Sequence, residues 1–284
     1  MSNLHLRYPD WRYKALTLSY DDGVEQDVKL LEIMRKYGLK GTFNLNSGVY
    51  PSEDNVWPEG QVHRRMTEKM VSETYVGDDI EVAVHGYTHP FWEQLSPCCT
   101  TYDIIQDRRT LENQFGRMVR GAAYPYGTYN DKVVEILGNC GICYCRTVNS
   151  SHDFYLPSNW LTLFPTCHHD DPQLFDLAQQ FIDRPEEHSA LMFYLWGHAY
   201  EFEANNNWDR IEKFAQMMGG RDDIWYATNI EIYDYVKAFD QLIFNVDMTK
   251  CYNPTQTDIW FEAHPFSYLN GSKYVVRAGE TIDL

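Results

Sequence analysis

KALTLSYDDG, residues 14–23, places two adjacent carboxylates directly after an apolar, strand-like run. A helical pattern begins just beyond Gly23. Two like charges side by side at a strand end are costly unless a cation or a chemical role supports them. The stretch therefore predicts a strand-to-helix unit with a polar site at the carboxyl end of the strand.

A second fragment can complete that site. EVAVHGYTH, residues 81–89, is another apolar run, and it leads to His85 and His89. One carboxylate and two histidines form a good ligand set for a divalent transition metal. The second carboxylate of the Asp-Asp pair would then be free to act as a base.

The rest of the chain alternates between strand-like and helical patterns. Strand-like runs occupy residues 14–21, 41–46, 79–85, 118–124, 142–148, 190–196 and 224–227; helical patterns occupy 24–37, 104–115, 133–137, 174–182, 208–218 and 229–239, the last with Asn229 as its cap. Repeated strand–helix units predict an α/β fold with a parallel sheet, and this many units predict a barrel. Short alternating runs at the end predict a small antiparallel β appendage. We expect a barrel over residues 1–240 and an appendage packed on it over residues 241–284.

Several polar side chains follow directly on predicted strands: Asp21 and Asp22, His85 and His89, Tyr126, and His198. The carboxyl ends of the strands of a parallel barrel meet at one rim, where catalytic groups gather. We therefore expect these residues, which lie far apart in the sequence, to surround one site.

Composition limits the partners. The 284 residues carry a formal net charge of −17, which argues against nucleic acid or an anionic membrane surface and is compatible with a saccharide or small-molecule substrate. No segment approaches the roughly 20 apolar residues that span a bilayer, and the first residues lack a secretory apolar core. Seven scattered cysteines fit reduced thiols. These features favour a cytoplasmic protein and leave its oligomeric state open.

The motifs resemble those of the polysaccharide deacetylase family, the NodB-homology group of carbohydrate esterase family 4. In order they are Tyr-Asp-Asp-Gly at 20–23, His-Gly-Tyr-Thr-His at 85–89, Tyr-Pro-Tyr-Gly at 124–127 and Leu-Trp-Gly-His at 195–198. The resemblance covers roughly residues 14–240. It implies a distorted (β/α) barrel of about seven strands and a metal-dependent deacetylase that hydrolyses an N-acetyl group.

The resemblance also implies roles for the residues of the first two motifs. Asp22, His85 and His89 correspond to the metal ligands, and Asp21 corresponds to the general base that deprotonates a metal-bound water. Zinc is favoured by this ligand type, and cobalt or nickel would satisfy the same set.

The later motifs imply the remaining roles. Tyr126 lies where the family supplies a backbone N–H to the developing oxyanion, and His198 corresponds to the general acid. Trp196 and Trp160 are either sugar-stacking platforms or core residues. Together with Tyr87, they are our candidate substrate-binding residues.

The chain also departs from the family pattern. Ala123 stands where the third motif has an arginine that orients the catalytic aspartate. Asn159-Trp160 replaces an Asp-Trp pair, and Gly197 replaces the leucine before the last histidine. The side chains that can substitute for the missing acid are Asp153, Glu201 and the pair His168-His169.

Three functions from different classes stay open at this point. The first is a metal-dependent amide hydrolase that acts on an N-acetylated sugar or on a non-sugar C–N bond. The second is a catalytically impaired protein that binds metal or carbohydrate, which the missing arginine motivates. The third is an iron(II) protein that activates oxygen through the same triad. The adjacent second aspartate favours the first, because oxygen-activating sites need no neighbouring base.

Overall fold

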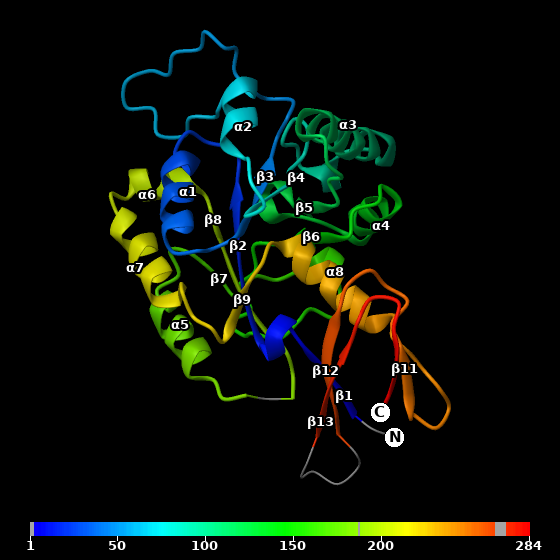
Figure 1. Cartoon of the computed structure of the whole chain (residues 1–284). Coiled ribbons are helices and arrows are strands. Elements are labelled where there is room, and N and C mark those ends of the chain that lie inside the picture. The colour runs from blue at the N-terminus through cyan, green and yellow to red at the C-terminus, as the bar shows by residue number, and fades with distance from the viewer. Residues whose placement is uncertain (1–2, 187, 265–270) are drawn as a thin grey trace.

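A curled sheet of parallel strands forms the centre of the molecule, with helices around it (Figure 1). The structure, a computed structural model, describes residues 3–186, 188–264 and 271–284. The strands of this sheet are β2 (Lys14–Asp21), β3 (Gly41–Leu45), β4 (Ile80–Val84), β5 (Gly121–Ala123), β6 (Tyr144–Arg146), β7 (Cys167–His168), β8 (Leu191–Gly197) and β9 (Ile224–Tyr226). The helices are α1 (Asp27–Lys36), α2 (Glu68–Thr74), α3 (Pro97–Phe115), α4 (Asp131–Asn139), α5 (Leu174–Asp183), α6 (Ala199–Ala204), α7 (Trp208–Met218) and α8 (Asn229–Asp240).

The strand order is β6-β5-β4-β3-β2-β8-β7, and the neighbouring strands run parallel. The eighth strand, β9, pairs with the first residues of β2, whereas β3 pairs with the last ones. In the part of the chain that the structure describes, no strand pairing joins β6 to β7, so the barrel is open there. The predicted distorted barrel of about seven strands is thus confirmed.

The predicted helices are present, but α3 begins at Pro97, about two turns before its predicted start at residue 104, whereas the ends of the other helices change less. Thr228, not Asn229, caps α8: its backbone is extended, and its side chain accepts the N–H of Glu231 in a capping box. Three short elements of the barrel, α2, α6 and β7, were not predicted from the sequence. No helix among the described residues is long and apolar enough to cross a membrane.

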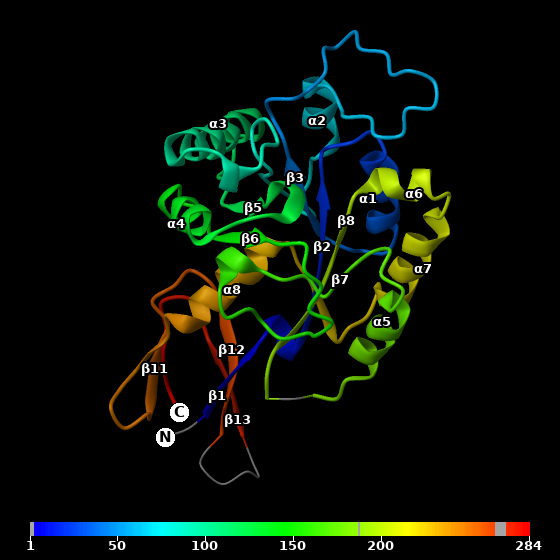
Figure 2. The ribbon, with the colours of Figure 1, turned by 180° about the vertical axis from the view of Figure 1, so that it is seen from behind.

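A small β appendage lies at the end of the sheet opposite α2 in both views (Figures 1 and 2). It has two antiparallel sheets, one of β1 (Asn3–Arg7), β12 (Ile259–His264) and β13 (Ser272–Val276), the other of β10 (Ile243–Phe244), β11 (Lys250–Tyr252) and β14 (Thr281–Asp283). The sequence did not predict that the N-terminal strand β1 belongs to it. Residues 265–270 of the predicted appendage lie outside the described residues.

Two apolar clusters hold these parts together. The larger one packs the parallel sheet against its helices. The smaller one joins the other face of β8, through Met192 and Tyr194, to α8 through Tyr235 and to the appendage through Phe261. The polar residues at the carboxyl ends of the strands are therefore supported by continuous apolar packing beneath them.

Candidate active site

The carboxyl ends of the central strands surround a cavity of about 460 Å³. It is lined by Asp21, Asp22, His63, Arg65, His85, His89, Tyr124, Tyr126, Gly127, Val148, Trp196, His198 and Tyr200. The structure thus brings together the residues that the sequence suggested for metal binding and for acid–base chemistry. Their meeting follows from the parallel sheet, which delivers all strand ends to one rim.

The backbone at this rim is strained. Asp22, His89 and Tyr126 have φ values of 81°, 54° and 58°, in the left-handed region that residues other than glycine seldom adopt. Such a conformation costs on the order of 1–3 kcal/mol and occurs preferentially at functional sites. Each of these three residues lines the cavity, where side chains from separate strands converge.

Asp22, His85 and His89 lie close enough to share one metal ion. One potential ligand atom of each lies within 4.8 Å of those of the other two. The two histidine Nε2 atoms are 3.2 Å apart, and His89 Nε2 lies 3.8 Å from Asp22 Oδ1. Ligand atoms at about 2.0–2.1 Å from a tetrahedral zinc are roughly 3.3 Å from each other. The triad therefore needs only a small contraction to hold such an ion.

The tautomer of His85 also suits a ligand. Its Nδ1–H donates to the carbonyl oxygen of Ala123 at 2.9 Å, so Nε2 carries the lone pair that faces His89. Burial lowers the pKa of His85, and burial together with the neighbouring His85 lowers the pKa of His89 to about 4. Both rings are therefore uncharged near neutral pH, and with Asp22 they form a donor set that fits a divalent transition metal.

Asp21 is held in one position from several sides. Asn44 Nδ2 donates to its Oδ1 at 2.8 Å, and the guanidinium of Arg146 donates to its Oδ2. His85 and His198 each place Nε2 3.8 Å from the same Oδ2. Burial raises the pKa of Asp21, but Arg146 and the two histidines outweigh burial, so the pKa lies below its usual value. Asp21 is thus an ionised carboxylate between two imidazoles.

His198 faces Asp21 with one nitrogen and Glu201 with the other. Nδ1 of His198 lies 3.4 Å from Glu201 Oε2. Glu201 also accepts the backbone N–H of His198 at 3.2 Å, because it occupies the third position of α6 in a capping box. Burial lowers the pKa of His198, but Glu201 and Asp21 outweigh burial and raise it above its ordinary value. The ring therefore tends to hold a proton.

Residues 10–145 match the family model described as polysaccharide deacetylase. This segment contains both the Asp-Asp and the His-x-x-x-His motifs. The resemblance to the polysaccharide deacetylase family is confirmed. A search of curated proteins finds no match to the chain.

The chain is similar to several solved structures, and the first of those named here shares its fold. A Mycobacterium smegmatis protein classed as a polysaccharide deacetylase is 15% identical with a TM-score of 0.57, over 84% of this chain and 96% of that one. A Streptococcus pyogenes deacetylase solved with acetate is 25% identical with a TM-score of 0.40, over 46% of this chain and 55% of its own. A carbohydrate esterase family 4 pseudoenzyme from Bacillus anthracis is 21% identical with a TM-score of 0.47, over 81% of this chain and 68% of its own. The chain thus spans about half the length of the streptococcal deacetylase.

The arginine of the polysaccharide deacetylase pattern is missing from β5 and is replaced from β6. Ala123, which stands at the expected position, is the register partner of Arg146 on the neighbouring strand. Arg146 is fully buried, contacts Asp21 and lies 4.3 Å above the Trp196 ring. The sequence analysis did not identify this residue. The sequence feature that could have identified Arg146 is a single arginine at the end of an apolar strand.

Glu201 and His169 account for two further departures from the family pattern, the absent acid of the Asp-Trp pair and the glycine at position 197. The Glu201 carboxylate lies 3.1 Å from Nε2 of both His168 and His169, besides its contact with His198. A Cβ atom at Gly197 would lie 2.0 Å from Nδ1 of His169, so glycine is required there for the His169 ring to fit. Of the suggested substitutes for the missing acid, Glu201 contacts His198.

The loop before α2 contributes two residues that the sequence analysis missed. Arg65 Nη2 lies 2.8 Å from Asp22 Oδ1, and His63 Nε2 lies 3.1 Å from Asp22 Oδ2. Although burial raises the pKa of Asp22, these two neighbours lower it well below its usual range. No local pattern marks either residue, because only the path of the loop brings them to β2.

Two acids on α3 position the loop that carries the histidines. Asp107 accepts the backbone N–H of His85 at 3.1 Å, and Asp103 accepts that of Tyr87 at 3.0 Å. Burial raises the pKa of Asp107 to about 7 despite its hydrogen bonds to Ser47 and His85. Both acids are buried and four residues apart, so they share one face of α3. Asp107 lies in the predicted helix and Asp103 directly before it, so their spacing was the sequence feature that could have identified them.

The predicted aromatic residues divide between the cavity and its surroundings. Trp196 lines the cavity, and so does Tyr126, which stacks on Phe91 with ring centroids 3.8 Å apart. Trp160 instead packs edge-on against Tyr233 in the smaller apolar cluster. Neither Trp160 nor Tyr87 lines the cavity, so we do not keep them as substrate-binding candidates.

Proposed function

We propose that this protein is a metal-dependent deacetylase that hydrolyses an N-acetyl amide on a sugar or a related small molecule. The observation that carries the proposal is the convergence of Asp22, His85 and His89, with ligand atoms within 4.8 Å, beside an ionised Asp21 and a proton-holding His198. The family match over residues 10–145 supports the same chemistry.

Asp22, His85 and His89 would hold the metal. A divalent ion bound there supplies an acidified water and polarises the substrate carbonyl. Zinc is our choice because two neutral imidazoles and a carboxylate suit it, and cobalt or nickel would also be accepted. Ala123 and Asp107 fix the ring and the backbone of His85, so the triad is oriented before any ligand enters.

Asp21 and His198 would carry the protons. Asp21 Oδ2, kept ionised by Arg146, accepts the proton of the attacking water. His198, kept protonated by Glu201, donates a proton to the departing amine nitrogen. Tyr126, held at a left-handed φ of 58°, is the candidate to present its backbone N–H to the oxyanion.

Aromatic rings near the cavity favour a saccharide or another flat-faced substrate. Tyr126 is half-exposed and stacked on Phe91, and Trp196 lines the cavity beside Arg146. Such rings bind the apolar faces of sugars. The proposed substrate is therefore a small saccharide that carries an N-acetyl group, and a non-sugar N-acyl amine is the alternative to be screened with it.

Metal content and acetate release test the proposal together. We expect the wild type to bind zinc at the triad and to release acetate from at least one acetylated amino sugar. His85→Ala/His89→Ala should lose both properties, and Asp21→Asn should keep the metal but lose a factor of about 10²–10⁴ in rate. His152→Ala, which changes a histidine outside the cavity, should change neither property. A wild type that takes up no metal at the triad contradicts the mechanism.

The competing function, an impaired binding protein, was motivated by the missing family arginine. Arg146 makes the contact with Asp21 that the family arginine would make. With that contact present, the described site contains a candidate for each acid–base role, and hydrolysis is the better-supported proposal.

A further inference from the structure

Three histidines gather at the junction between the appendage and the barrel, outside the active-site cavity. They are His5 on β1, His264 at the end of β12, and His188 in the segment that leads to β8. The ring centroid of His5 is 4.6 Å from that of His188 and 4.9 Å from that of His264, and the last two are 4.9 Å apart. One nitrogen of each ring lies within 4.8 Å of the others.

Strand register brings two of these histidines together. β1 and β12 are antiparallel, with His5 opposite Glu262 and residue 3 opposite His264. Because alternate residues of a strand share a face, His5, Arg7, Glu262 and His264 all lie on the same face of this sheet. His188 approaches this face from the barrel, so the three rings come from segments far apart in the sequence.

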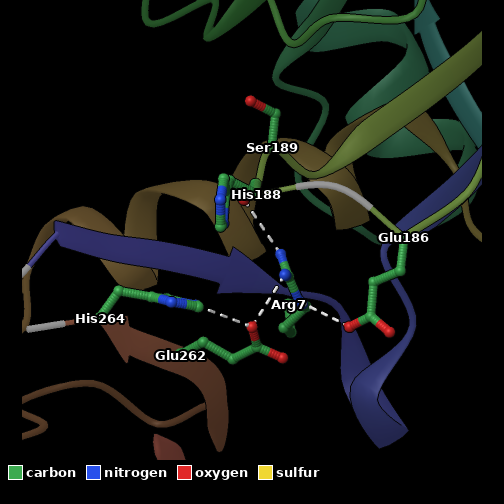
Figure 3. A pocket seen from close by; sticks show the side chains of 6 residues that line it. All are labelled: Arg7, Glu186, His188, Ser189, Glu262 and His264. Atoms are coloured by element: carbon green, nitrogen blue, oxygen red, sulfur yellow. Dashed lines mark hydrogen bonds and ion pairs between the residues drawn. The ribbon is translucent and has the colours of Figure 1, made fainter. Parts of the chain in front are cut away.

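A buried ion pair supports the cluster from below. Arg7, which is 1% exposed, donates to Glu262 Oε2 at 3.0 Å and to the backbone carbonyl of His188 at 3.1 Å (Figure 3). Glu262 Oε2 in turn lies 3.3 Å from His264 Nε2. Histidines that bind metals usually donate their other ring N–H to such a carboxylate, which fixes the tautomer. Arg7 and Glu262 therefore hold both His188 and His264 in place.

The cluster has the chemistry of a ligand set rather than of a charged patch. Three imidazoles at these separations would repel one another if all were protonated. Among the described residues, no side chain forms a hydrogen bond with the ring of His5 or of His188. A Cβ atom at Gly271 would lie 2.4 Å from His264 Nε2, so the backbone there packs closely on the third ring. One nitrogen of each ring thus lies close to those of the other two, in an arrangement that a shared ion can bridge.

A cavity of about 580 Å³ opens beside the cluster and gives a route for an ion. Figure 3 shows its lining residues, Arg7, Glu186, His188, Ser189, Glu262 and His264. His188 is exposed, whereas His5 and His264 are partly buried. The site is thus reachable from solvent and retains space for a water as a further ligand.

We propose that His5, His188 and His264 form a second site for a divalent transition metal such as zinc, nickel or cobalt. Three imidazole nitrogens with one open position are a known donor set for these ions. The bound ion would connect β1 and β12 of the appendage to the chain that enters β8, so its role is structural. This proposal does not depend on the proposed deacetylase activity.

Zinc stoichiometry tests the proposal. Full-length protein without a polyhistidine tag is stripped with a chelator, reloaded with zinc and dialysed, and its zinc content is measured by elemental analysis. We expect two equivalents in the wild type and in the control His152→Ala, and one in His85→Ala/His89→Ala. His5→Ala/His264→Ala should also hold one. A wild type with a single zinc that the His85 and His89 substitutions remove completely overturns the proposal.

A second measurement keeps the test decisive if the double variant at the junction folds poorly. His188 is exposed, so His188→Asn removes one ligand with little disturbance of packing. In the His85→Ala/His89→Ala background, zinc should raise the melting temperature, and His188→Asn should abolish that rise. An equal rise with and without His188 contradicts a three-histidine site.

Discussion

Replacing Arg146 by methionine tests whether its contact with Asp21 maintains the acid–base site. The side chains of Arg146 and Asp21 are 0% and 3% exposed. Methionine keeps apolar bulk against Trp196 but leaves the carboxylate buried without its cation. Loss of one partner of a buried ion pair costs about 3–5 kcal/mol of unfolding free energy. At roughly 2 °C per kcal/mol for a chain of this size, the melting temperature should fall by about 6–10 °C.

The pH dependence of that loss identifies its cause. Arg146 lowers the pKa of Asp21 in the folded state, so their pairing stabilises the protein above the unfolded pKa of Asp21. This stabilisation is lost as the pH falls through the folded pKa. In Arg146→Met, burial instead raises the pKa of Asp21. The two proteins should therefore differ most near neutral pH and converge in acid, and the acid limb of kcat/KM should move to higher pH in the variant.

Thermal melts of chelator-treated proteins across this pH range, together with the pH–rate profile of the reloaded enzymes, provide the assay. The double variant Arg146→Met/Asp21→Asn serves as a control, since it contains no buried carboxylate and should recover most of the lost stability. A loss of stability that is equal at all pH values, or a double variant no more stable than Arg146→Met, would refute the reasoning.

Three further substitutions test other parts of the structure. Glu201→Gln removes the carboxylate that raises the pKa of His198, so the basic limb of the pH–rate profile should move to lower pH; an unmoved limb contradicts the assigned role. Gly197→Ala places a Cβ 2.0 Å from His169 Nδ1 and should cost about 1–3 kcal/mol in denaturant unfolding, which His169→Ala in the same chain should relieve. Burial raises the pKa of Glu81 from 4.5 to about 7, so the folded state favours the protonated carboxyl and wild-type stability should fall by roughly 3 kcal/mol as the pH rises between these values. Melts of Glu81→Gln from pH 4 to 8 should lack that fall, and its persistence would show that another group is responsible.

Most of the central sheet could be predicted from local patterns, and the exceptions have physical causes. Strands such as β2 and β8 are long apolar runs that are buried along their whole length, so their composition alone identifies them. β7 has two residues and α6 has six, which is too short for a period to be recognised. The pairing of β1 with β12 joins opposite ends of the chain, and no local pattern can indicate it.

The residues of the site likewise divide into those that a local motif identifies and those that only the fold brings there. Asp22, His85 and His89 could be identified because each belongs to a short motif at a strand end. Arg65 lies in a loop without a motif, and its contact with Asp22 depends on the path of that loop. Trp160, which the sequence left open between a sugar-stacking platform and a core residue, packs into the smaller apolar cluster.

The departures from the family motifs are compensated by residues that only the fold makes adjacent. Arg146 lies directly across the strand pair from Ala123, so a guanidinium can reach Asp21 from β6 as well as from β5. Likewise, the space opened by Gly197 is occupied by His169, which contacts Glu201. In both cases a neighbouring strand, or the segment that follows one, supplies a polar group. The motif residues that these groups support, the carboxylate of Asp21 and, through Glu201, the imidazole of His198, keep their positions. The geometry around the reacting groups, and not the identity of each motif position, is therefore the property by which activity in such a chain has to be judged.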